Sequence, residues 1–200
     1  MCEERSDELR RSVYSTPNPS ARRRELGKVT FVPAVQYHHG LDVTGAAAES
    51  VRLVRYLNVV VAKDANLAFT QMPMLAEAAC PPQVMYSNLG IMSPPPMNIV
   101  LAHLRTLVDQ GAWLNDWDYT GDGPIAVFSS IFKYLEDNYD KLSPRIKEAL
   151  SSTALIPVGS SLIEPRRMFF RLSMNLKPLL FELPRWCNAY ATLFENVGVR

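Results

Sequence analysis

The side chains that could carry out nucleophilic chemistry are few and widely separated in this sequence. Cys2, Cys80 and Cys187 form no Cys-x-x-Cys pair, which zinc ribbons and thiol redox sites use. Ser160 and Ser161 lack the Gly-x-Ser-x-Gly elbow that exposes a serine nucleophile. We therefore expect no catalytic nucleophile, and we interpret Cys187 as a small core residue.

Histidine and aspartate residues also fail to form a ligand-binding pattern. His38 and His39 are adjacent and would point apart in an extended segment, and His103 is distant in the sequence. The acidic loop at residues 115–124 lacks an oxygen ligand at its closing position, where Val127 stands, so we interpret it as a polar turn. No glycine-rich phosphate loop follows a strand pattern. The sequence therefore predicts no metal, no cofactor and no enzymatic activity.

Arginines near the C-terminus are the candidate contact residues for a partner. Aromatic residues are interleaved with four of them: Arg166, Arg167, Arg171 and Arg185. Such a pattern could bind an acidic peptide or a nucleic-acid strand. The simpler interpretation is a half-buried strand that directs its arginines toward water. A second candidate surface is the proline-rich segment 72–96, which we expect to be an exposed loop.

Composition indicates an ordinary soluble globular protein. Of the 200 residues, 48% are hydrophobic and 20% are charged, which excludes fully disordered, collagen-like and coiled-coil classes. The net charge of +1 argues against a protein that coats nucleic acid electrostatically. No run approaches the roughly 20 apolar residues of a membrane span, and the first residues have no signal-peptide core. We expect a protein of the cytoplasm, with the nucleus as the alternative.

Several segments carry strand signals. Residues 29–35 form a short β-branched run, and residues 153–173 form two short runs joined through Gly159. Residues 51–63 fit a helix or a strand, with Val59 to Val61 favouring strand in the second half. Residues 1–25 are polar and charged and predict a flexible leader.

Four segments show the apolar stripe of an amphipathic helix. They are residues 97–111, 125–141, 144–152 and 183–199. Ser143 and Pro144 are a favourable cap and first-turn pair for the third. The element order predicts an α+β fold of short, hairpin-like strands packed with amphipathic helices, and it excludes a doubly wound dinucleotide fold. We expect one domain over 26–200, or two packed halves at 26–92 and 93–200.

The segment at residues 154–200 resembles the large repeats of sacsin and sacsin-like proteins. Those repeats contain, in this order, an Ile-Pro-Val strand ending in glycine, a proline turn and a closing Leu-Phe helix. The matching positions are Ile156, Pro157, Val158, Gly159, Leu162, Phe170, Leu172, Pro178, Phe181, Glu182, Leu183, Pro184, Leu193, Phe194, Val197 and Gly198. Residues 93–109 and 29–35 are similar to the family as well.

The resemblance implies the part of a repeat that follows a GHKL-type ATPase domain. The nucleotide-binding signatures of that domain, an acidic-x-x-x-Asn-x-x-Asp helix and an Asp-x-Gly-x-Gly loop, are absent from this sequence. The expected function is thus a non-catalytic protein-interaction module of a chaperone-associated protein, whose partner is chaperone machinery or a client. The alternative is a nucleic-acid-associated factor that binds through Arg22 to Arg24 and the basic C-terminal segment. A fragment with ATPase activity is the third hypothesis.

Overall fold

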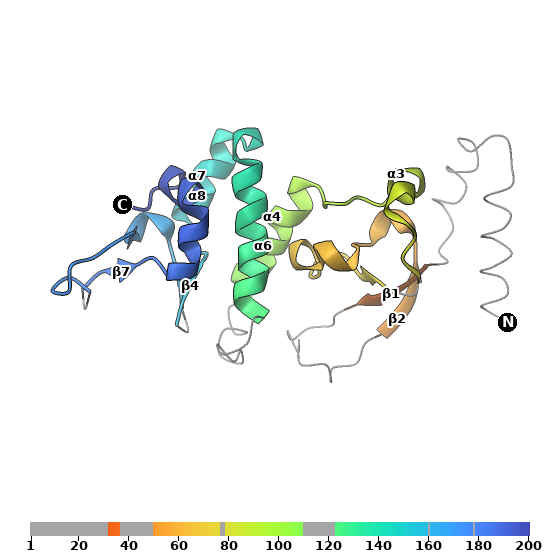
Figure 1. Ribbon diagram of the computed structural model, residues 1–200, viewed down its shortest axis with the longest axis horizontal. Coiled ribbons are helices and arrows are strands. Elements are labelled where there is room, and N and C mark those ends of the chain that lie inside the picture. Colours follow the sequence, from red (N-terminus) through yellow and green to blue (C-terminus); the bar gives the residue numbers. More distant parts are fainter. Residues whose placement is uncertain (1–31, 37–49, 77–78, 110–122, 160, 178) are drawn as a thin grey trace, which may run out of the picture.

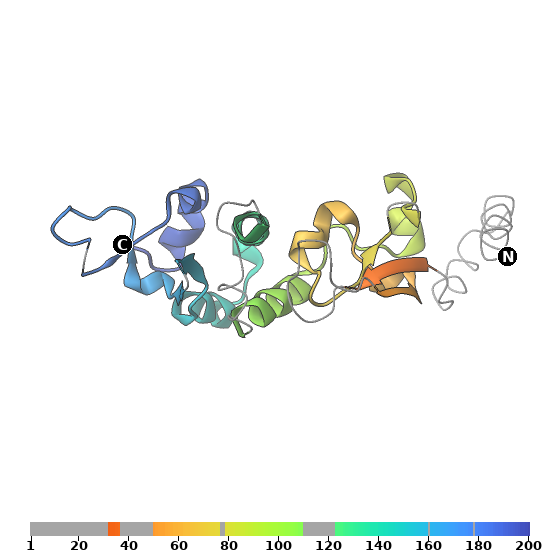
Figure 2. The same ribbon diagram turned by 90° about the horizontal axis from the view of Figure 1, so that it is seen from below.

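A computed structural model describes residues 32–36, 50–76, 79–109, 123–159, 161–177 and 179–200. The predicted leader and residues 115–122 of the acidic loop lie outside these ranges. The molecule is elongated: a small sheet lies toward one end, helices α4 (Met97–Asp109) and α6 (Gly123–Asp137) lie in the middle, and the C-terminal residues lie toward the other end (Figures 1 and 2). The structure confirms the predicted α+β class.

The N-terminal sheet contains three antiparallel strands in the order β2-β1-β3. These are β1 (Val32–Gln36), β2 (Ser50–Val54) and β3 (Met74–Leu75). Strands β1 and β2 are in register from Val32 opposite Val54 to Gln36 opposite Ser50. The proline in β1, Pro33, accepts a hydrogen bond from the backbone N–H of Ala76 at 3.2 Å. Alternating side chains of this sheet, such as Val32 and Ala34, are buried.

The strand in segment 51–63 forms in its first half, so the preference for strand at Val59 to Val61 was wrong. After β2 the chain enters two 3₁₀ turns, η1 (Tyr56–Asn58) and η2 (Ala62–Leu67). Val60 makes only an isolated parallel bridge to Met74. All three valines are buried. Burial, rather than strand pairing, therefore explains this apolar run.

Segment 72–96 is less exposed than we expected. It contains β3, the 3₁₀ turn η4 (Gln83–Met85) and the short helix α3 (Tyr86–Leu89). Leu75 and Ile91 are buried in the core of the N-terminal part, whereas Val84 in η4 is 81% exposed. The prolines therefore shape short turns around a core, and the exposed residues lie mainly within 80–88, with Met92 and Pro94 exposed as well.

The helices agree with their apolar stripes. They are α4 (Met97–Asp109), α6 (Gly123–Asp137) and α7 (Pro144–Ser152). The Ser143 hydroxyl accepts from the backbone N–H of Ile146 at 3.4 Å, which confirms the predicted cap. The last predicted helix is divided into a 3₁₀ segment, η7 (Arg185–Tyr190), and α8 (Ala191–Asn196).

Aromatic packing around α6 forms the centre of the larger core. The Phe132 ring contacts Phe194 edge to face, with 5.1 Å between centroids, and stacks on Trp186 at 5.8 Å. Leu67 from η2 belongs to the same cluster. A residue that precedes the expected boundary at 92/93 thus packs with helices that follow it, and the division into two halves stays a prediction.

The C-terminal part contains two small strand pairs. Strands β4 (Ile156–Val158) and β5 (Ser161–Ile163) form an antiparallel hairpin, as predicted, with Gly159 at a φ of +58° in the turn. Strands β6 (Met168–Phe169) and β7 (Phe181–Glu182) pair in parallel. None of the helices in the described ranges combines the length and apolar character that crossing a membrane requires.

Candidate interaction surface

The four candidate arginines are exposed, but they do not lie along one strand. Arg166 and Arg167 belong to a 3₁₀ turn, η6 (Pro165–Arg167), and Arg171 follows the two-residue strand β6. Arg185 begins η7. The expectation of a half-buried arginine strand was therefore wrong, because Pro165 sets the backbone for a turn and removes an N–H that a strand would use.

Two of these arginines make local contacts. The Arg166 Nε donates to the Glu164 carboxylate at 2.7 Å, and the Arg167 guanidinium lies 5.8 Å from the centre of the Phe181 ring. Arg171 and Arg185 form no ion pair with any residue in the described part of the chain. These two cations are therefore the ones free to meet a carboxylate of another molecule.

The segment that connects β6 to β7 carries a group of exposed apolar side chains, which we call the apolar loop. It projects from the body of the molecule near the C-terminus in both ribbon views (Figures 1 and 2). Met174 is 81% exposed and Leu179 is 77% exposed. The large exposed apolar residues are Met174, Leu176, Leu179 and Leu180, and Phe181 at the start of β7 adjoins them and is counted with the loop.

The base of the apolar loop is fixed by the chain's C-terminal residues. The N–H of Phe170 donates to the carbonyl of Arg200 at 2.7 Å, and the N–H of Arg200 donates to the carbonyl of Met168 at 3.1 Å. Lys177 and Glu182 form an ion pair at 2.7 Å between the loop and β7. The exposed apolar side chains are thus held on an anchored segment.

Sequence reasoning did not single out the apolar loop as a contact surface. Its signal is present in residues 174–181, where Lys177 and Pro178 interrupt an apolar run. A charged residue and a proline inside such a run argue against a buried central strand. Only Pro178 and Phe181 of this run were used, as positions that match the sacsin repeats, because periodicity does not show which side chains point to solvent.

The buried titratable side chains Cys187 and His103 have structural roles. Burial raises the pKa of the Cys187 thiol, which keeps it protonated and confirms the predicted core role. His103 is fully buried, and burial lowers its pKa to about 4. Its Nε2 donates to the Asn66 carbonyl at 3.2 Å, and its Nδ1 accepts from the Thr70 hydroxyl at 2.6 Å. Both groups are therefore neutral near pH 7.

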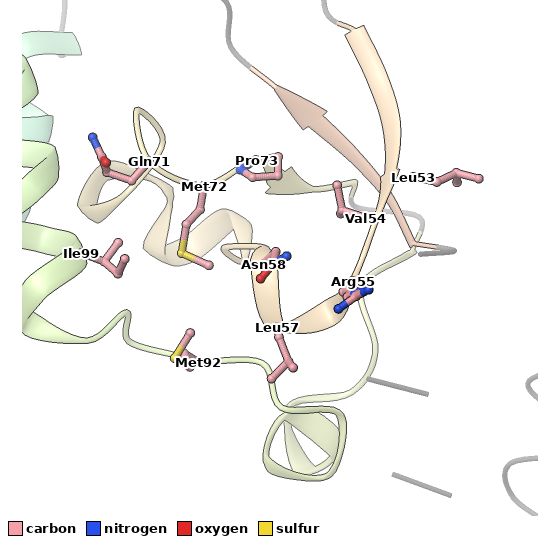
Figure 3. A pocket seen from close by; sticks show the side chains of 10 residues that line it. All are labelled: Leu53, Val54, Arg55, Leu57, Asn58, Gln71, Met72, Pro73, Met92 and Ile99. Carbon is pink, nitrogen blue, oxygen red and sulfur yellow. The ribbon is translucent and has the colours of Figure 1, made fainter. Parts of the chain in front are cut away.

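An open groove of about 560 Å³ lies beside the N-terminal sheet. One wall comes from the end of β2 and from η1, and the other from Met72, Pro73, Met92 and Ile99 (Figure 3). The side chains of Leu57 and Met92 both lie in the lower part of Figure 3. The Leu53 side chain points away from the groove. Among the described residues that line it, Arg55 is the only charged one.

Comparison with known proteins identifies no relative. No family model, curated protein or solved structure matches the chain. Within the described residues, no group of three histidine, cysteine, aspartate or glutamate side chains could hold a metal ion. The apolar loop and the groove are therefore the features from which a function is argued.

Proposed function

We propose that this chain is a non-catalytic protein-interaction module of a sacsin-like, chaperone-associated protein of the cytoplasm. The observation that carries the proposal is the apolar loop, where five large apolar side chains are exposed within residues 174–181. A contiguous group of this kind costs solubility when it stays in water, and burying it against a partner is favourable. A partner protein that covers the loop with its own apolar side chains would remove this exposed apolar surface from water.

The charges beside the loop specify the partner further. Arg171 lies at the start of the loop and Arg185 at the beginning of η7, and neither pairs with a carboxylate in the described ranges. An arginine at the rim of an apolar contact favours a partner that carries carboxylates there. The expected partner is thus a protein segment with apolar residues next to acidic ones.

The sacsin resemblance supplies the chaperone context of the proposal. It is strongest over residues 154–200, which include the β4–β5 hairpin and the apolar loop. Several matching positions have clear roles in the fold, such as Gly159 in the hairpin turn and Phe194 in the core. A repeat part without the ATPase signatures would act by binding, and chaperone machinery or a client is the corresponding partner.

Quantitative capture from a nuclease-treated lysate tests the proposal with the full chain as bait. Two variants change the surface: Leu179→Ser with Leu180→Ser, and Arg171→Glu with Arg185→Glu. Val84→Ser is the matched control, because Val84 is an exposed apolar residue outside the loop. We expect each surface variant to capture about tenfold less chaperone or client than wild type. A loss of this size is typical of an interface that loses its central contacts.

Capture by the surface variants that equals wild type, at an unchanged Tm, would contradict the proposal. Capture that disappears after nuclease treatment would instead favour the nucleic-acid-associated alternative, and a steep dependence on salt would accompany it.

A further inference from the structure

The groove beside the N-terminal sheet adjoins a strand edge that no other strand of the described residues pairs with. Strand β2 is the edge strand of the sheet, since the order is β2-β1-β3. Residues 53–55 at its end also form part of the groove wall. A peptide that binds along this edge would therefore continue directly into the groove.

The register shows which backbone groups of β2 face outward. Pro33 uses its carbonyl toward the β3 side, where Ala76 donates to it at 3.2 Å. Its partner across β1–β2 is Leu53. In an antiparallel pair, residues opposite each other alternate between mutually bonded and outward-facing backbone groups. The N–H and C=O of Leu53 therefore point away from β1, toward the open edge of the described sheet.

Most side chains around the edge and the groove are apolar, beside the polar Asn58 and Gln71 and the charged Arg55, and several of the apolar ones are accessible. Leu53 is 61% exposed and Leu57 is 44% exposed, and Met92 is exposed as well. An edge strand with an exposed leucine usually carries some protection against pairing with other chains. Here the exposed edge leads into a groove with apolar walls, which is the arrangement found where an extended peptide adds a strand to a sheet.

Charge identifies the chemistry of the occupant. Arg55 is the only ionised side chain among the described residues of the groove lining, and none of these residues carries a carboxylate. It also makes no ion pair with the rest of the described chain. A bound carboxylate would complete its hydrogen bonding in a charge-assisted, bidentate pair. One arginine is too little positive charge to follow a nucleic-acid backbone.

We propose that the β2 edge and its groove bind an extended segment of a partner protein by strand addition. The segment pairs with the backbone of Leu53, places a large apolar side chain between Leu57 and Met92, and directs a carboxylate to Arg55. This binding site is separate from the apolar loop and does not depend on the function proposed for that loop.

Selection from a random-peptide phage library on the full chain tests the binding chemistry. We expect enriched peptides to carry an acidic residue close to a large apolar one. Synthetic copies should bind Arg55→Glu about tenfold more weakly, because the variant loses a charged hydrogen bond and gains a like charge. Arg145→Glu is the charge-matched control, because Arg145 is an exposed arginine of α7 outside both the groove and the apolar loop, and this variant should bind as wild type.

Backbone amide exchange measured by NMR tests the strand pairing with the tightest selected peptide. We expect the Leu53 amide to exchange about tenfold more slowly in the complex, since it then donates a hydrogen bond. The proposal is overturned if no peptide is enriched, if Arg55→Glu and Arg145→Glu weaken binding equally, or if a bound peptide leaves Leu53 exchange unchanged. An oligonucleotide that displaces the peptide would overturn it as well.

Discussion

His103 is a residue whose neutral form is part of the fold. It lies on α4, and its ring hydrogen-bonds to Asn66 of η2 and to Thr70, which follows η2 in the chain. The Phe69 ring meets it edge to face, with 4.5 Å between the ring centres. A proton on this imidazole would place a charge in the core and would remove the acceptor that the Thr70 hydroxyl uses.

The protonation of His103 predicts a loss of stability in mild acid. Its pKa is about 4 in the folded protein, so between that value and the unfolded value of about 6.5 the unfolded state binds more protons. The free energy of unfolding should therefore fall by about 2 kcal/mol from pH 7 to pH 5 through this group. Urea denaturation at both pH values measures the change. In His103→Gln this contribution should be absent, and an undiminished pH dependence would argue against it.

Phe132 predicts the cost of removing the centre of the larger core. Its ring contacts Phe128, Trp186, Tyr190 and Phe194. Phe132→Ala should lower the free energy of unfolding by about 3–5 kcal/mol, because it removes buried area and leaves a cavity. Leu179→Ala, on the exposed loop, should change it by less than about 0.5 kcal/mol. Similar losses in the two variants, measured in urea, would contradict this assignment of the core.

At the scale of elements, two glycines end a helix and turn a hairpin. Gly90 follows α3 with a φ of +75°, and Gly159 connects β4 to β5. Alanine at either position should cost about 1–2 kcal/mol, because a side chain disfavours the left-handed conformation. A Cβ at Gly90 would also overlap the Leu57 side chain. A Cβ at Gly159 would have no atom of the described residues, apart from its chain neighbours, within 4 Å.

Gly90→Ala should therefore be the more destabilising of the two substitutions. Thermal unfolding of both variants measures the difference. Adding Leu57→Ala to each variant is the control, since it removes the overlap at Gly90 and changes nothing at Gly159. If the difference persists in the Leu57→Ala background, the contact between Gly90 and Leu57 is not its cause.

The elements that the sequence predicted well are those with long, regular patterns. The stripe over residues 97–111 gave α4, and the cap at Ser143 gave the start of α7, because helix periodicity and capping are local properties. The β4–β5 hairpin was predicted from two short runs joined by a glycine. These features depend on neighbours in the sequence, which a single chain reveals.

Other features depend on contacts between distant residues and were missed. Val59 to Val61 have strand propensity, but burial between sheet and turns decides their structure. Arg166 and Arg167 resemble part of a strand, yet Pro165 places them in a turn. The apolar loop and the groove beside β2 could not be predicted. Both depend on which apolar side chains stay exposed after folding, and this is decided by packing between residues that are distant in the sequence.

At the scale of the whole molecule, the two proposed surfaces lie far apart. The groove adjoins β2 in the N-terminal sheet, and the apolar loop extends beyond β7 at the other end of the elongated structure (Figure 1). The larger core lies between them and includes residues of η2, α4, α6 and α8. Two partners could therefore bind at once, as a scaffold requires.

Nucleotide should have no effect on the stability of the chain. The ATPase signatures of the sacsin family are absent, and no glycine-rich phosphate loop is present in the sequence. A ligand that binds the folded state raises the Tm. We expect thermal scans with and without excess Mg-ATP to coincide. An upward shift would support the hypothesis of an ATPase fragment.

Site-specific photocrosslinking tests the central claim, protein binding by the apolar loop, most directly. The photoreactive amino acid p-benzoylphenylalanine is placed at Leu179 in the full chain, and at Val84 as a control of similar exposure. The account predicts that position 179 forms adducts that resist nuclease and are digested by protease, and that mass spectrometry identifies chaperones or clients in them. Adding Arg171→Glu and Arg185→Glu should abolish these adducts. Equal adducts at both positions, or adducts at Leu179 that nuclease removes, would contradict it.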